Sequence, residues 1–70
     1  MKEELFVVCV LDKSNGWLMY LEDDGTALVH DRERAALFTE DIASRVVNRF
    51  KCSSSEIAFI VRIHVNLYLI

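Results

Sequence analysis

The sequence contains no proline, only two glycines and only two cysteines among its 70 residues. Because few residues interrupt regular structure, we expect helices and strands joined by short turns over most of the chain. Two cysteines, Cys9 in an apolar segment and Cys52 in a polar one, are too few for the dense disulfide framework of small secreted domains. Free thiols and a reducing, cytoplasmic location are therefore expected.

The sequence also lacks an excess of basic residues, since eight Lys and Arg stand against eleven Asp and Glu, for a net charge of -3. Generic binding to nucleic acid normally requires a basic excess on one face. The start, Met-Lys-Glu-Glu, lacks the basic region and cleavage site of a signal peptide. The most apolar stretch, 57–70, contains Arg62, His64 and Asn66 and is too short and too polar for a transmembrane helix. We expect neither export nor insertion into a membrane.

Apolar residues make up 53% of the chain, which favours one folded domain over residues 1–70. The clearest element is a helix over 39–50. Thr39 is placed to cap its free amides, and the acidic residues Glu40 and Asp41 suit the positive end of the helix dipole. The apolar residues of the helix recur at helical spacing and form one stripe: Ile42, Ala43, Val46, Val47 and Phe50.

Two strands joined by a hairpin are expected before this helix. Residues 4–12 and 17–22 are rich in β-branched and aromatic side chains. Between them, Asn15-Gly16 is the strongest short signal for a two-residue turn. Such a turn pairs Ser14 with Trp17, Asp12 with Met19, and Val10 with Leu21. Neither face of this hairpin is polar enough to lie in water.

Shorter elements complete the prediction. Residues 23–25 form a turn, 26–30 a short third strand, and 31–36 a single capped helical turn, after which Leu37 and Phe38 enter the core. Residues 57–70 alternate as a long last strand, with Phe59, Val61 and Ile63 on one side. The predicted fold class is α+β, a small antiparallel or mixed sheet of three to four strands in the order β-β-(β)-α-β, with one helix packed on one face.

The spacing Asp31-x-x-x-Ala35-x-x-Phe38-Thr39, followed by Glu40-x-x-Ala43-x-x-Val46 in the helix, resembles a loose class of short bacterial and bacteriophage proteins of unknown function. The resemblance spans residues 6–65 and lies in packing positions. It implies a β-β-(β)-α-β unit and a phage or prophage origin, and it carries over no catalytic residue. Residues 66–70 depart from the pattern.

No motif in the sequence predicts catalysis, a metal or a cofactor. Residues 22–26 are acidic but lack the ligand spacing of an EF-hand, so we expect a solvated turn. The serines of 53–55 lie in a loop without a base to activate them, and there is no glycine-rich phosphate loop. The spacing of a zinc site is missing among the available ligands, which are His30, His64, Cys9 and Cys52. We predict a non-enzymatic protein.

The strongest functional signal is a surplus of apolar surface. One helix covers only one face of a sheet, and a chain of this length has no spare element for the other. The alternative is that loops and the long last strand curl over that face. We favour a homodimer, formed either by packing of sheet on sheet or by pairing or exchange of the long last strand. We predict a self-associating interaction module with these residues at the self-interface: Phe6, Val8, Val10, Trp17, Met19, Leu21, Ile63, Val65 and Leu67.

A second candidate surface is the polar side of the helix together with nearby basic residues. Its members are Arg32, Arg34, Arg45, Asn48, Arg49 and Lys51. Acidic residues interleave with them at Glu33, Glu40 and Asp41, which favours an ordinary solvated face. The alternative function is a regulator that binds nucleic acid or a host or phage protein through these residues.

Overall fold

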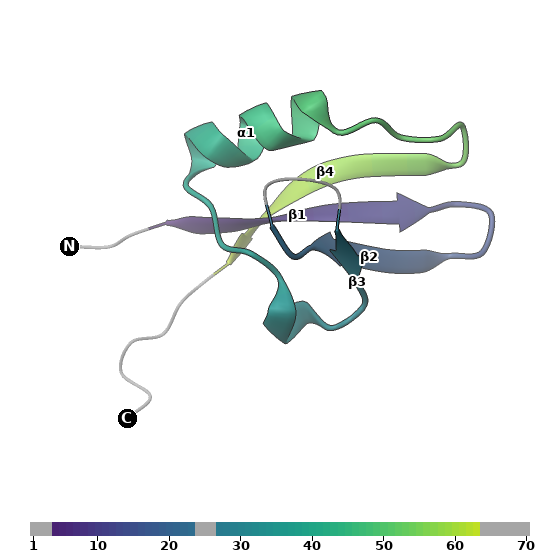
Figure 1. Ribbon diagram of the computed structural model, residues 1–70, viewed down its shortest axis with the longest axis horizontal. Coiled ribbons are helices and arrows are strands. Elements are labelled where there is room, and N and C mark those ends of the chain that lie inside the picture. Colours follow the sequence, from purple (N-terminus) through teal and green to yellow (C-terminus); the bar gives the residue numbers. More distant parts are fainter. Residues whose placement is uncertain (1–3, 24–26, 64–70) are drawn as a thin grey trace.

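The computed structural model describes residues 4–23 and 27–63. It contains a four-stranded antiparallel sheet and one α-helix (Figure 1), which confirms the predicted α+β class. The strands are β1 (Leu5–Asp12), β2 (Trp17–Leu21), β3 (Leu28–Val29) and β4 (Glu56–Ile63). They lie in the sheet in the order β3-β2-β1-β4. A 3₁₀ helix, η1 (Arg32–Arg34), and the α-helix α1 (Glu40–Arg49) stand between β3 and β4 in the chain.

β1 is one of the two inner strands of the sheet and pairs with both β2 and β4. It pairs along its whole length with β4, from Leu5 opposite Ile63 to Asp12 opposite Glu56. Its centre, residues 6–10, is buried throughout. An uninterrupted apolar run is the pattern expected of a strand whose two faces are both shielded from water. β4 begins one residue before the predicted strand, and the predicted continuation beyond Ile63 lies outside the described residues.

The β1–β2 hairpin has a wider connection than predicted. Asp12 pairs with Trp17 and Val10 with Met19, so residues 13–16 form a four-residue loop and the predicted pairing is wrong by two residues. Because side chains alternate along a strand with a period of two, a shift of two residues leaves every side chain on its predicted face.

Polar contacts inside the loop account for its length. The carboxylate of Asp12 accepts hydrogen bonds from the backbone N–H of Ser14 at 3.0 Å and from its hydroxyl at 2.7 Å. The side-chain oxygen of Asn15 accepts from the N–H of Trp17 at 2.9 Å. Gly16 has a φ of 75°, a conformation that glycine adopts without steric cost, and its N–H donates to the carbonyl of Asp12 at 2.7 Å.

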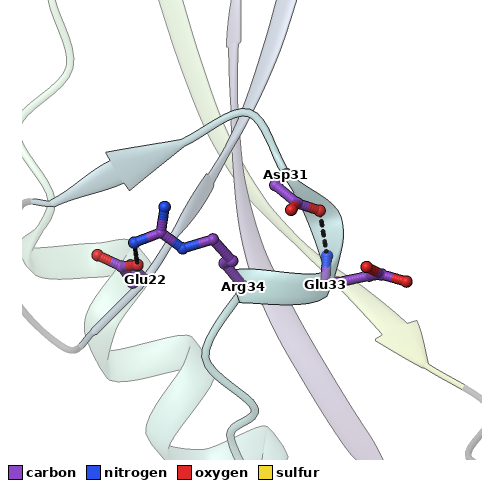
Figure 2. Close-up of polar contacts among 4 residues, drawn as sticks. All are labelled: Glu22, Asp31, Glu33 and Arg34. Atoms are coloured by element: carbon purple, nitrogen blue, oxygen red, sulfur yellow. Dashed lines mark hydrogen bonds and ion pairs between the residues drawn. The ribbon is translucent and has the colours of Figure 1, made fainter.

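A break separates η1 from α1, as predicted. Asp31 caps η1 by accepting a hydrogen bond from the backbone N–H of Glu33 at 3.0 Å (Figure 2). Phe38 then exchanges backbone hydrogen bonds with Phe6, both at 2.8 Å, and so extends the sheet beside β1. Phe38 is buried, whereas Leu37 is 52% exposed. The prediction that both enter the core is wrong for Leu37, because neighbours in an extended segment point in opposite directions.

α1 lies within the predicted helix 39–50 and buries Ala43 and Val46. Thr39 occupies the capping position, but its side chain makes no capping hydrogen bond, contrary to the prediction. Ile42 is 46% exposed, so the buried stripe is narrower than the apolar pattern suggested. Charge still favours this helix, because Glu40 and Asp41 stand in its first turn and Arg49 in its last.

The core fills the space between α1 and one face of the sheet. It consists of Phe6, Val8, Leu21, Phe38, Ala43 and Val46, with Leu28, Ala36, Val47, Phe50 and Ile60 packed around them. We call this side of the sheet the helix face. α1 packs across β1 and β4, and η1 lies beside β2 (Figure 1). Among the described residues, none of the helices has the length and apolar character needed to cross a membrane.

Candidate functional site

The sheet has a second face, opposite the helix face, and its residues follow from the strand register. Cys9 lies opposite Tyr20 on β2 and Phe59 on β4, and Tyr20 lies opposite Val29 on β3. Alternation then assigns the rest of this side. We call it the open face, and its members are Leu5, Val7, Cys9, Leu11, Leu18, Tyr20, Val29, Ile57, Phe59, Val61 and Ile63. None of them is charged.

The open face is apolar from one side of the sheet to the other. At its centre, Val7 and Cys9 are buried between the side chains of the neighbouring strands. Towards its margins, Leu18 is 39%, Ile57 45% and Val61 38% exposed. Within residues 4–23 and 27–63, every helix that packs on the sheet does so on the other side or at its edge. A continuous apolar surface of this kind is typical of an interaction site.

The predicted self-interface residues are divided between the two faces. Four of them, Phe6, Val8, Val10 and Leu21, are buried on the helix face, which corrects their assignment to an exposed surface. They lie there because α1 and the Phe38 bridge cover that side. Met19 is half-buried and Trp17 is 58% exposed on the same side, beyond the core. Ile63 belongs to the open face, and Val65 and Leu67 lie outside the described residues.

Trp17 forms part of a shallow hollow at the hairpin end of β2. The hollow is lined by Gly16, Trp17, Leu18 and His30. The rings of Trp17 and His30 meet edge to face, with centroids 5.1 Å apart and planes at 86°. Such an edge-to-face contact is an ordinary way for two rings to pack, so the hollow needs no ligand to explain it.

The structure does not bring the predicted basic residues into one patch. Arg34 forms an ion pair with Glu22 next to β2 (Figure 2). Arg45 and Arg49 are exposed on α1, which packs against β1 and β4, whereas η1 contacts β2 and lies apart from α1 in the view of Figure 1. The remaining members of the set, Arg32, Asn48 and Lys51, are also exposed, the first on η1 and the other two on or just after α1. The set therefore forms two separate groups.

Among the titratable side chains of residues 4–23 and 27–63, Cys9 and Asp12 have shifted pKa values. Burial raises the pKa of the Cys9 thiol, which makes it a poor nucleophile at neutral pH. Hydrogen bonds from Ser14 hold the pKa of Asp12 below its usual value. Cys52 is exposed. In the part of the chain that the structure describes, no three His, Cys, Asp or Glu side chains gather as metal ligands would, and His64 falls outside that part.

Comparisons of the chain with protein families, with curated proteins and with solved structures found no match. We therefore infer function from the two surfaces described above, the open face and the basic residues of η1 and α1. Of these, the open face has the most distinctive composition, because strands from the whole width of the sheet contribute only apolar side chains to it. The predicted self-interface includes Phe6, Val8, Val10 and Leu21, which the structure buries on the helix face. The signal that was missed is the pairing between Phe6 and Phe38, which places the Phe38 side chain, just before α1, in the same core cluster as Phe6.

Proposed function

We propose that this protein is a small, non-catalytic interaction module that associates with a second copy of itself through the open face. The observation that carries the proposal is the composition of that face, which is uncharged across all four strands. Three of its residues, Leu18, Ile57 and Val61, remain more than a third exposed in the single chain. Burying such surface is favourable in proportion to its area.

A second copy is a suitable partner because a two-fold contact joins a patch to itself. An uncharged apolar face meets its own copy without repulsion and without leaving a charge unpaired. Two twisted sheets pack face to face at about 10 Å, with their strands about 30° apart. The open face of each copy would then form half of a sandwich core, with α1 on each outer side.

The size of the face sets the expected strength of this contact. β1 and β4 have eight residues each and β2 has five, so these three strands side by side cover at most roughly 27 Å by about 14 Å. Two such faces in contact bury on the order of 800 Å², which is below the roughly 1,200 Å² of stable specific interfaces and in the range of weak, transient contacts. We therefore expect a dimer that dissociates on dilution.

The alternative surface, formed by arginines, has weaker support. Arg34 is engaged by Glu22, and the cations of η1 and α1 lie on separate elements, η1 beside β2 and α1 across β1 and β4. A nucleic-acid site draws its affinity from cations that follow one phosphate backbone. Two separated groups in a chain of net charge -3 do not provide that arrangement.

Leu18→Lys tests the proposal, because it places a charge on the open face at a position exposed enough for the monomer to fold. The matched control is Ile42→Lys, which adds the same charge at a comparably exposed apolar residue on α1. Light scattering coupled to size-exclusion chromatography measures the mean mass of each variant. We expect Leu18→Lys to weaken association at least about tenfold, since a lysine buried in the contact loses its hydration.

Ile42→Lys should associate like the wild type, because its side chain lies on the other side of the molecule. Equal mean masses for Leu18→Lys and the wild type, at concentrations where the wild type associates, would remove the open face from the contact. Circular dichroism of both variants confirms that they are folded at the concentrations used.

A further inference from the structure

β4 has a long outer edge. It is the last strand of the sheet order β3-β2-β1-β4, with eight residues that include neither proline nor glycine. Within residues 4–23 and 27–63, no strand pairs with its outer side. Exposed edge strands of this length normally carry a bulge, a proline or an inward charge that prevents pairing with another chain. β4 instead pairs with β1 in unbroken register.

The bonding of β1 shows which backbone groups of β4 point outward. Phe6 exchanges its N–H and C=O bonds with Phe38, on the side of β1 away from β4. Because the bonding direction alternates along a strand, Cys9 directs its backbone groups towards β4 and bonds to Phe59. The neighbours of Phe59, Ala58 and Ile60, therefore direct their N–H and C=O groups to the free side. In the described residues no other backbone group bonds to them there.

We propose that β4 pairs antiparallel with β4 of a second copy, centred on Phe59, and joins two sheets into one. In this register Phe59 lies opposite its own copy, and Ala58 of each chain exchanges backbone hydrogen bonds with Ile60 of the other. Ile57 lies opposite Val61 on the open face. Aromatic and β-branched pairs of this kind stabilise neighbouring strands.

Charge complementarity selects this register. Antiparallel pairing centred on Phe59 puts Glu56 of each chain opposite Arg62 of the other, twice in the symmetric contact. If the pairing were centred on Ala58, Arg62 would lie opposite Ser54, and if it were centred on Ile60, Arg62 would lie opposite Ala58. Either register loses both Glu56–Arg62 pairs. Arg62 is available because its present partner, Glu4, lies at 3.5 Å and both side chains are more than half exposed. Such an exposed pair contributes little.

This edge contact uses a different surface from the open face and does not depend on it. Two strands of one continuous antiparallel sheet are related by a two-fold axis perpendicular to the sheet, whereas two stacked faces are related by an axis parallel to it. Two perpendicular two-fold axes can be present in one assembly, so both contacts together would form a closed tetramer. The edge contact therefore doubles the width of the open face that each pair presents.

A charge-reversal cycle tests the edge contact in the Leu18→Lys background, where the open face is disabled. We expect that background to remain dimeric at high concentration, measured by sedimentation velocity of the full chain. Adding Glu56→Arg or Arg62→Glu alone should weaken this dimer about tenfold, because each change turns both attractive pairs into like-charge pairs. Adding both should restore it.

The double reversal distinguishes a contact between copies from a role within one chain. Inside the chain, Glu56 accepts a hydrogen bond from the N–H of Ser53 at 3.0 Å and Arg62 pairs with Glu4, and the double reversal breaks both. Recovery can then come only from the partner copy. A Leu18→Lys protein that stays monomeric, or a double reversal no better than the single ones, would overturn the edge contact. If Leu18→Lys associates as strongly as the wild type, and its dimer responds to the charge reversals as expected, then only the open-face proposal is contradicted.

Discussion

At the scale of single residues, Asp12 organises the hairpin loop. Hydrogen bonds from the Ser14 hydroxyl and N–H lower its pKa in the folded chain. A folded pKa below the unfolded value of about 3.9 means that the ionised carboxylate stabilises the fold. This contribution is complete above the unfolded pKa and disappears as the pH falls through the folded pKa.

We therefore predict that Asp12→Asn is less stable than the wild type at neutral pH and that the difference closes below about pH 4. Urea unfolding of both proteins across that range measures the difference. Ser14→Ala should show the same trend, because it removes the hydroxyl donor. A difference that stays constant with pH would mean that Asp12 acts by shape and not by charge.

The two cysteines provide a second residue-scale prediction. Burial raises the pKa of Cys9 and shields its sulfur, while Cys52 is exposed. In the native protein, a disulfide reagent such as DTNB should modify Cys52 rapidly and Cys9 only at the rate of unfolding. Cys52→Ser should remove the fast phase. Rapid modification of Cys9 in that variant would show that the centre of the sheet is accessible.

At the scale of elements, α1 holds the helix face closed. Val46 is 3% exposed and packs in the core, while its neighbour Arg45 is exposed. Val46→Ala should lower the free energy of unfolding by about 2 kcal/mol, because it leaves a cavity in the core. Arg45→Ala should change it by less than about 0.5 kcal/mol. Equal and small effects in urea unfolding would show that α1 is only loosely attached.

Local patterns predicted these elements well. The limits of α1 follow from its apolar spacing. The side chains of β1 and β2 lie on their predicted faces although the hairpin register was wrong, because the predicted and observed pairings differ by two residues and side chains alternate with a period of two. The register itself was missed because Asp12, Ser14 and Asn15 bond within the loop and widen it. A turn signal such as Asn15-Gly16 does not include those side-chain bonds.

Which side of the sheet α1 covers could not be predicted from the sequence. β1 has almost equally apolar faces, so its pattern does not distinguish Phe6 and Val8 from Val7 and Cys9. The choice depends on a contact between distant parts of the chain, the bridge between Phe6 and Phe38. The candidate self-interface therefore moves to the open face, while the reason for expecting one is unchanged.

At the scale of the whole molecule, the described part of this 70-residue chain has one α-helix and an apolar sheet surface on the side opposite that helix. Domains are usually built from layers that shield each other, and here the second layer is missing from the described part of the chain. The open face and the edge of β4 would each bring another copy to supply it. The two contacts differ in chemistry, since the first is apolar and the second includes paired charges.

Sedimentation equilibrium of the wild-type chain, from about 1 µM to about 100 µM, shows directly whether the chain associates with itself. We expect a mean mass that rises with concentration from the 8.1 kDa of the single chain to at least twice that value. A mass that stays at 8.1 kDa over the whole range would contradict it.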